Sequence, residues 1–181
     1  MEYFLFAESL LQRGDCMIFG KKDKDGNIAV NIMLNEGIPN WMGGSNVRLV
    51  LDDSNSQLRI ESRINKKYPP ALLKYSQLTA AEVVTEQEIR TKSKSVVGRA
   101  VIGGLLLGSL GATIGGISGI GIKQKISEKQ YLVINYTSSV DSEPKVLSFE
   151  IVGATLHLSD FIIALKSKLP APNPELATPY L

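Results

Sequence analysis

The sequence contains little of what disulfides, metal sites and nucleic-acid surfaces are made from. Its 181 residues include one cysteine, Cys16, and one histidine, His157. One cysteine excludes a disulfide within the chain, and one residue of each type disfavours a zinc site of histidine and cysteine ligands. The formal net charge of +2 is small, and the basic runs are not interleaved with aromatic residues. We therefore expect no nucleic-acid partner.

Catalytic motifs are missing as well. His157 lies beside Ser159 and Asp160 in the run ATLHLSD, but a general base also needs a positioned partner and a reactive group within reach. We interpret it as a residue at a strand end or a helix cap. Cys16 would need an activating base to act as a nucleophile, and the sequence indicates none. We expect a protein without enzymatic activity.

Carboxylates gather in one stretch without forming a recognisable motif. Glu82, Glu86 and Glu88 fall on or beside a predicted strand, on which Glu86 and Glu88 would face the same side. Two such carboxylates can act as an acid and a base or hold a metal ion. A solvated strand face requires neither role, and we adopt that interpretation. We predict no metal and no cofactor.

Short strand-like segments separated by turns make up most of the chain. Residues 27–34 alternate apolar side chains on one face, and the charged turn GKKDKDG predicts a hairpin with residues 16–19. Further strand-like runs occupy residues 46–52, 57–64, 71–78, 80–89, 130–139 and 144–152. Because every strand is short and bounded by turn residues, antiparallel pairing is expected.

One amphipathic helix is predicted after the strands, at residues 159–169. Ser159 can cap it, Asp160 suits its first turn, and Pro170 ends it. A strongly bent sheet or small barrel could be closed at one end by this helix. The prediction is a mainly β protein.

The two ends of the sequence differ from this middle part. The run MEYFLFAESLL carries Glu2 and Glu8 and lacks a basic region and a cleavage site, so it predicts a packing helix rather than a signal peptide. The last residues are rich in proline. We expect an N-terminal helix and hairpin extension at 1–45, a domain at 46–169 with an insertion at 96–122, and a mobile tail at 170–181.

A glycine-rich segment at residues 100–122, AVIGGLLLGSLGATIGGISGIGI, contains no charged residue. Five of its eight glycines recur at helical spacing, namely Gly104, Gly108, Gly111, Gly115 and Gly119. On a helix they would form one smooth stripe that another backbone can approach closely. Each glycine costs about 0.8–1 kcal/mol relative to alanine in a helix, so the segment needs a partner surface to be ordered. It lacks the Lys-Ser/Thr ending of a phosphate-binding loop.

Basic residues flank the glycine-rich segment on both sides. They are Arg90, Lys92, Lys94 and Arg99 before it, and Lys123, Lys125 and Lys129 after it. Positive charge at both ends favours both ends on the cytoplasmic side, which predicts a hairpin that enters one leaflet and turns near residues 108–111. Each helical arm would then reach about 16 Å, half the hydrocarbon core. Arg90, Lys92, Lys94, Arg99, Lys123 and Lys125 would contact headgroups or other anions.

The same hairpin could instead face protein. Five apolar residues would then pack on a second copy of the chain or on the domain itself, namely Ile102, Leu105, Leu106, Ile114 and Ile117. A third interpretation buries the segment within the monomer, although seven strands and a helix already form a complete core. The sequence leaves membrane, partner and internal packing open.

The order of elements resembles that of bacterial pleckstrin-homology-like (PH-like) domains. The resemblance lies in LLKYSQLTAAEVVTEQEI and in VVGRAVIGGLLLGSLGATIGGISGIG followed by YLVINYTSS, and it covers about residues 46–169. It implies a bent antiparallel barrel of seven strands, a C-terminal helix and an inserted glycine-zipper helical hairpin, as in proteins of Gram-positive bacteria and their prophages. Related chains often carry a cysteine-rich ribbon in their N-terminal third, which Cys16 alone cannot form.

The resemblance supplies no shared catalytic residues and implies a binding role. We expect a cytoplasmic, non-enzymatic binding or scaffold protein, in some states attached to the inner face of the membrane. Its glycine-zipper hairpin would mediate homo-oligomerisation or shallow membrane attachment. The alternative is a phage-type antagonist of host defence that sequesters a small signalling molecule or blocks a host protein.

Overall fold

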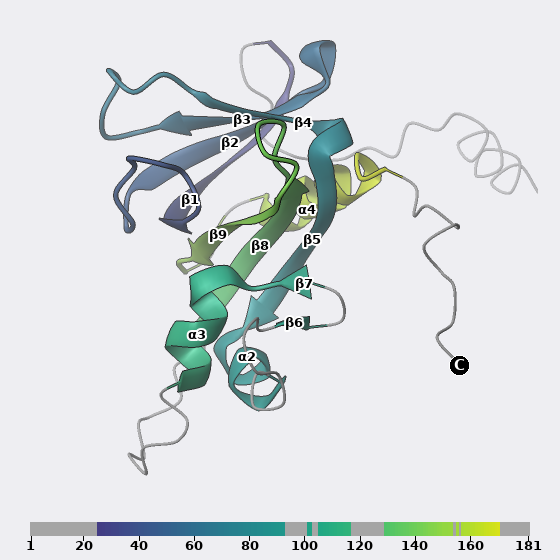
Figure 1. Cartoon of the computed structure of the whole chain (residues 1–181). Coiled ribbons are helices and arrows are strands. Elements are labelled where there is room, and N and C mark those ends of the chain that lie inside the picture. Colours follow the sequence, from purple (N-terminus) through teal and green to yellow (C-terminus); the bar gives the residue numbers. More distant parts are fainter. Residues whose placement is uncertain are drawn as a thin grey trace, which may run out of the picture.

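The computed structural model describes residues 25–92, 101–102, 105–116, 129–153, 155 and 157–170. The predicted N-terminal helix, the strand at 16–19 and the tail beyond residue 170 lie outside these residues. Seven strands form one antiparallel sheet in the order β4-β3-β2-β1-β9-β8-β5 (Figure 1). Their bounds are β1 (Ile28–Glu36), β2 (Asn46–Asp52), β3 (Gln57–Ser62), β4 (Ala71–Lys74), β5 (Leu78–Thr85), β8 (Gln130–Thr137) and β9 (Pro144–Ile151).

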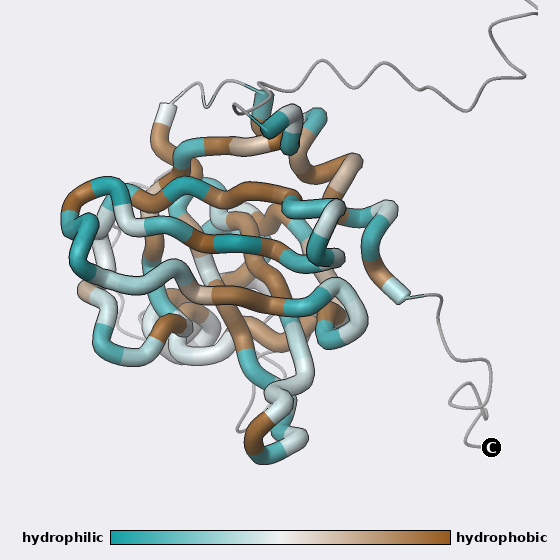
Figure 2. Tube along the Cα trace, turned by 90° about the horizontal axis from the view of Figure 1, so that it is seen from above, coloured by the Kyte–Doolittle hydropathy of each residue, from teal (hydrophilic) through white to brown (hydrophobic). Residues whose placement is uncertain are grey.

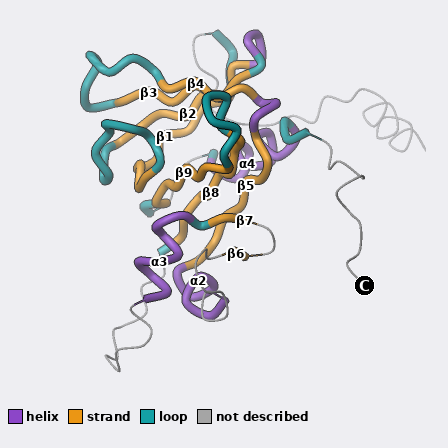
Figure 3. The backbone as a smooth tube through the Cα atoms, viewed as in Figure 1, coloured by secondary structure: helices purple, strands orange, loops and turns teal. Residues whose placement is uncertain are grey.

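The sheet is bent but not closed into the predicted barrel. Strands β4 and β5 are its two edges, and no ladder joins them among the described residues. A single 3-10 turn, η2 (Tyr75–Gln77), lies between these strands and takes the chain from one edge of the sheet to the other. Figure 3 shows β1–β4 in the upper part of the view, at an angle to β5, β8 and β9.

Strand β1 lies inside the sheet rather than in a separate extension. Its residues Ile28–Met33 pair with β2, and its end pairs with β9 across a bulge between Leu34 and Glu36. A boundary at residue 46 therefore falls between two paired strands, and the sheet begins at Ile28. The predicted alternation of residues 27–34 is confirmed, because Val30, Ile32 and Leu34 are all buried.

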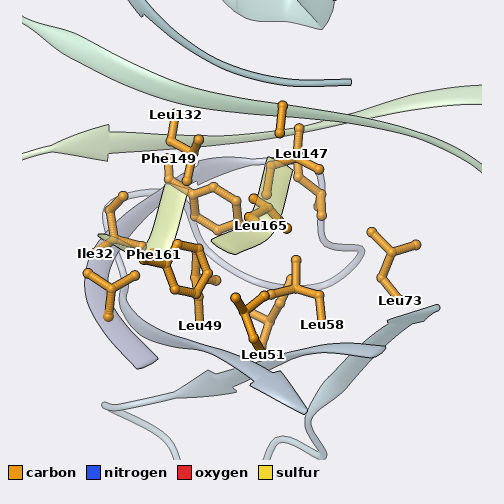
Figure 4. Close-up of a cluster of buried hydrophobic side chains, with 14 of the residues drawn as sticks. Ile32, Leu49, Leu51, Leu58, Leu73, Leu132, Leu147, Phe149, Phe161 and Leu165 are labelled. Atoms are coloured by element: carbon orange, nitrogen blue, oxygen red, sulfur yellow. The ribbon is translucent and has the colours of Figure 1, made fainter. Parts of the chain in front are cut away.

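The main core fills the concave side of the sheet and is covered by helix α4 (Leu158–Ser167). Figure 4 shows Phe161 and Leu165 of the helix between Phe149 and Leu147 on one side and Leu49, Leu51 and Leu58 on the other. Hydrophobic and hydrophilic residues alternate along the strands (Figure 2), as strands with one face on a core require.

The predicted C-terminal helix is confirmed to within two residues, but its cap is not Ser159. His157 occupies the N-cap position with φ +62° and makes no side-chain capping bond. At the other end, Lys168 binds Asp53 at 2.9 Å and lies over the ring of Tyr75. These contacts tie the end of α4 to two turns, η1 (Asp53–Asn55) between β2 and β3 and η2 between β4 and β5.

The prediction of a strand through residues 80–89 is correct only as far as Thr85. Helix α2 (Glu86–Lys92) begins there, so Glu86 and Glu88 do not share a strand face. Thr85 and Glu88 form a capping box: the Glu88 N–H donates to the Thr85 hydroxyl at 3.1 Å, and the Thr85 N–H donates to the Glu88 carboxylate at 2.8 Å.

Candidate functional site

The glycine-rich segment is the strongest functional candidate in the sequence, and within its described residues the helix is limited to Gly108–Gly116. Val101–Ile102 (β6) pairs antiparallel with Leu105–Leu106 (β7), and a helix, α3, spans Gly108–Gly116. The predicted helical first arm is therefore wrong at residues 101–102 and 105–106. Strand β7 is extended because a side chain of the main sheet binds its backbone, as described below.

The segment between β5 and β8, which contains the insertion, leaves and rejoins the sheet at the same end. The Glu86 N–H donates to the Lys129 carbonyl oxygen at 2.9 Å, directly beside the pairing of Thr85 with Gln130. Lys129 also binds Glu150 at 2.9 Å, and this bond raises the pKa of Lys129 above its usual value. The insertion therefore leaves and rejoins the sheet at one fixed point.

The described part of the insertion packs on the outer face of β5, β8 and β9, opposite α4 (Figure 1). Its buried side chains are Leu105, Leu107, Leu110 and Ile114. They contact a patch formed by Val84, Ile89, Tyr131 and Val133. Burial raises the pKa of the Tyr131 phenol in this patch. The sequence leaves a bilayer, a second copy and the domain itself open for Leu105 and Ile114, and in the structure both side chains are buried in a cluster with residues of the chain's own sheet.

Asn135 holds strand β7 by its backbone. Its side-chain oxygen accepts from the Leu106 N–H at 2.6 Å, and its amide nitrogen donates to the Leu106 carbonyl at 2.8 Å. Asn135 is 3% exposed. One side chain thus satisfies both polar groups of a partly buried residue, which would otherwise cost free energy.

Glu36 holds the start of helix α3. Its carboxylate accepts from the Leu110 N–H at 3.2 Å and from the Ser109 hydroxyl. A carboxylate at this position satisfies helix donors that lack an internal partner and complements the helix dipole. Glu36 reaches the helix from the end of β1, just past the bulge.

Gly108 is required by both backbone and space. Its φ is +55°, and a Cβ there would lie 3.0 Å from Glu36 Oε1 and 3.4 Å from Val146 Cβ. Gly108 itself is exposed, whereas Gly111 is buried, and α3 packs beside α2. Gly108 and Gly111 therefore serve the approach of the helix to its own chain.

The outward side of α3 is small and uncharged. Ser109 and Thr113 are exposed, and Leu106 before the helix is half-buried. The Thr113 hydroxyl donates to the Ser109 carbonyl at 2.9 Å, so both hydroxyls bond within the chain. Helix α3 contains no charged residue from Gly108 to Gly116.

For the other predicted contact residues, the structure describes either the backbone alone or neither backbone nor side chain. Arg90 and Lys92 fall in α2 and Gly115 in α3, without described side chains. The remaining ones lie outside the described residues, namely Gly104, Gly119, Ile117, Lys94, Arg99, Lys123 and Lys125.

The other candidate groups are placed as follows. Glu82 on β5 binds Lys166 of α4 at 2.7 Å, and His157 Nδ1 lies 3.9 Å from Asp160 Oδ2. In the portion of the chain that is described, no group of three histidine, cysteine or acidic residues could hold a metal ion. No helix in that portion is long and apolar enough to span a bilayer.

Sequence reasoning missed Asn135 and Glu36. A signal for Asn135 was present, because it interrupts the apolar run YLVIN, which reads as a strand buried on both faces. Glu36 carries no such signal. Its role depends on a helix that begins more than 70 residues later in the chain.

The strand order, with one helix against the concave side of the sheet, is consistent with a PH-like fold. A family model described as "Glycine zipper containing PH domain" matches residues 40–147, which is more than half of the chain. The protein belongs to this family. Comparisons with curated proteins and with solved structures gave no match.

Proposed function

We propose that the protein is a non-enzymatic binding module that assembles with further copies of itself through its glycine-rich insertion. The observation that carries the proposal is the outward side of α3. It presents Ser109 and Thr113, whose hydroxyls are already bonded within the chain, and it carries no charge. An uncharged helix face of small residues suits close approach of another backbone.

The attachment of the insertion supports the same role. Asn135 and Glu36 bind the insertion by its backbone and helix terminus, while four apolar side chains pack beneath it. A surface held in this way has a fixed orientation, which lowers the ordering cost of association. Contacts to a second copy would come from the outward side of α3 together with Ile117 and Gly119.

A matched pair of substitutions, each of which introduces an arginine, tests the proposal. Thr113→Arg places a long cation on the exposed side of α3, and Ile163→Arg places the same group at a 60%-exposed position of α4. We expect light scattering after size exclusion at micromolar concentration to show an oligomer for the wild type and for Ile163→Arg, and a smaller species for Thr113→Arg. A monomeric wild type would contradict the proposal, as would an unchanged Thr113→Arg assembly.

Shallow membrane attachment is the second candidate, and the positive flanks favour it. Arg90, Lys92, Lys94 and Arg99 precede the glycine-rich segment, and Lys123 and Lys125 follow it. Each cation near an anionic surface contributes about 1 kcal/mol. Sedimentation with anionic and with zwitterionic liposomes distinguishes this candidate. Binding to anionic liposomes by a monomeric wild type would favour the membrane, and no binding would exclude it.

The apolar contacts of the insertion decide how these tests are designed. Removing residues 100–122 would uncover Tyr131 and Val133, and the exposed face could itself cause aggregation. Substitution at Gly108 would disturb packing within the chain. Thr113 is the better position, because its side chain is exposed and its hydroxyl bonds within the helix.

A further inference from the structure

A second surface with binding chemistry lies on β3 and the loop that follows it, away from the insertion. A hollow of about 470 Å³ is lined by Glu61, Ser62, Arg63, Lys66, Tyr68 and Pro70. This volume falls within the range of about 300–1,000 Å³ that small-molecule sites occupy. A second cavity, about 190 Å³ and mostly apolar, lies between β4 and Tyr136 and is below that range.

The hollow carries uncompensated positive charge. Arg63 and Lys66 have no ion-pair partner within the described ranges of the chain. Glu61 is the one carboxylate in the lining, and it binds Arg59 Nε at 2.9 Å. Arg59, which lies outside the hollow, offsets part of the Glu61 charge, and the lining itself holds two cations and one carboxylate.

An aromatic ring forms another part of the wall. Tyr68 stacks on Trp41 with ring centroids 5.6 Å apart, yet 42% of Tyr68 stays exposed. The stack also joins the β1–β2 loop to the β3–β4 loop and so fixes the ring. A fixed ring next to two cations offers both stacking and charge to the same ligand.

Hydrogen bonds from backbone N–H groups to nearby residues hold the loop after β3 in shape. The Asn65 N–H donates to the Ser62 hydroxyl at 3.0 Å, the Lys67 N–H donates to the Asn65 side chain at 3.0 Å, and the Tyr68 N–H donates to the Asn65 carbonyl. Such preorganisation lowers the ordering cost of binding a small ligand.

We propose that this hollow binds a soluble, phosphate-bearing ligand with a planar ring, of which a nucleotide is the simplest example. Arg63 and Lys66 bind the phosphate, and the ring of the ligand lies against Tyr68. Arginine suits phosphate through its paired N–H groups, and lysine acts as a point charge. The ring contact distinguishes such a ligand from inorganic phosphate alone.

Trp41 provides the readout, because it is the single tryptophan of the chain and contacts Tyr68 directly. A panel of nucleoside mono- and diphosphates is titrated into the full-length protein while Trp41 emission is followed, with inorganic phosphate and a nucleoside as separate probes. We expect saturable binding of at least one nucleotide, tighter than either part alone. Absence of saturable binding across the panel overturns the proposal.

Variants with a matched control locate the site. The double substitution Arg63→Gln with Lys66→Gln should weaken nucleotide binding by about tenfold or more, since each charged hydrogen bond is worth about that factor. Lys67→Gln removes a cation from the same loop without touching the hollow and should change affinity less than about twofold. Equal losses of nucleotide affinity in the double variant and in Lys67→Gln would indicate general electrostatic attraction to the loop rather than a defined site. That result would overturn the proposal.

A vesicle experiment separates the two sources of phosphate. Vesicles of phosphatidylglycerol and phosphatidylcholine are tested against the same three proteins. We expect the double substitution not to change vesicle binding. Vesicle binding that depends on Arg63 and Lys66, without any nucleotide binding, would assign the hollow to a lipid headgroup and overturn the proposal for a soluble ligand.

Discussion

The two faces of strand β8 are both buried, but they are covered in different ways. On the inner face, Leu132 and Ile134 pack into a core of large side chains from the sheet and α4. On the outer face, Tyr131 and Val133 meet a short strand and a helix rich in glycine. On the outer face, hydrogen bonds from Asn135 and Glu36 supplement the apolar contacts.

The difference shows how a glycine-rich segment can cover a sheet. Leucine and phenylalanine supply contact area on the inner face, where burial of each side chain is worth about 1.5–3 kcal/mol. Glycines supply none, so the outer cover depends on backbone groups that come close enough to be bound by side chains of the sheet. Outer-face stability therefore depends on a few polar residues together with four apolar side chains of the insertion, whereas inner-face stability is spread over many apolar residues.

The largest expected loss of stability comes from Leu132, which faces the inner core, and it is compared with that of its neighbour Val133, which faces the insertion. Leu132 and Val133 are both 0% exposed. We expect Leu132→Ala to lower the free energy of unfolding by about 3 kcal/mol, and Val133→Ala by about 1–2 kcal/mol because it deletes less apolar surface. Urea unfolding measures both. An equal or larger loss for Val133→Ala would contradict the distinction between the faces.

Removing the backbone contact of β7 should have the next largest effect. Asn135→Leu leaves the Leu106 N–H and carbonyl without their partner, and we expect a loss of about 2 kcal/mol. Hydrogen exchange should increase at the Leu106 amide more than at the amides of α4. Asn31→Leu, at an exposed position of β1, serves as control and should stay within about 0.5 kcal/mol of the wild type. Unchanged exchange at Leu106 would show that Asn135 does not hold the strand.

A smaller effect is expected at Gly108. Gly108→Ala places a Cβ at φ +55° and 3.0 Å from Glu36, so we expect a loss of about 1.5 kcal/mol. Gly44→Ala has φ +79° but open space around its Cβ, and should cost about 1 kcal/mol. Thermal unfolding of the two variants separates backbone strain from crowding. Equal losses would mean that Glu36 shifts without cost.

The smallest expected effect is a pH dependence of stability, and it arises at Asp52, away from both faces of β8. Hydrogen bonds from Asn55 hold the pKa of Asp52 below its usual value. A carboxyl group with a lowered folded-state pKa stabilises the fold above its unfolded-state pKa, near 3.8, and this contribution is lost as the pH falls further. We expect the stability difference between wild type and Asp52→Asn to shrink between about pH 5 and pH 2. A difference that does not vary with pH would contradict this assignment.

Much of the sheet could be predicted from the sequence. Strands β1, β2 and β3 and helix α4 each bury one face. A periodic pattern of apolar residues predicts such a single buried face, and all four elements show one. Helix α2 was predicted as strand because AAEVVTEQEI begins with a strand pattern. The Thr85-x-x-Glu88 capping box within it was a readable sign that a helix starts there.

The insertion was harder to predict for a physical reason. The glycine spacing fits a helix across residues 104–119, yet Leu105 and Leu106 are extended because Asn135, far away in sequence, binds Leu106. Pairings over such a distance leave no local pattern. The continuous apolar run of β8 did signal that both of its faces are covered, and this cover is what Leu105 and Ile114 provide.

The pairing of Thr85 with Gln130 also has a consequence for how the chain folds. Strands β5 and β8 can meet only after the entire insertion has been closed into a loop, and the entropy of that closure must be lost before the contacts form. Most of the remaining ladders join strands close in sequence and can form early. The pairing of β5 with β8 is therefore expected to form late, together with the pairing of β1 with β9, which joins residues even farther apart in the sequence. Shortening the insertion should speed this step only slightly, since each halving of a flexible loop saves about 0.6 kcal/mol.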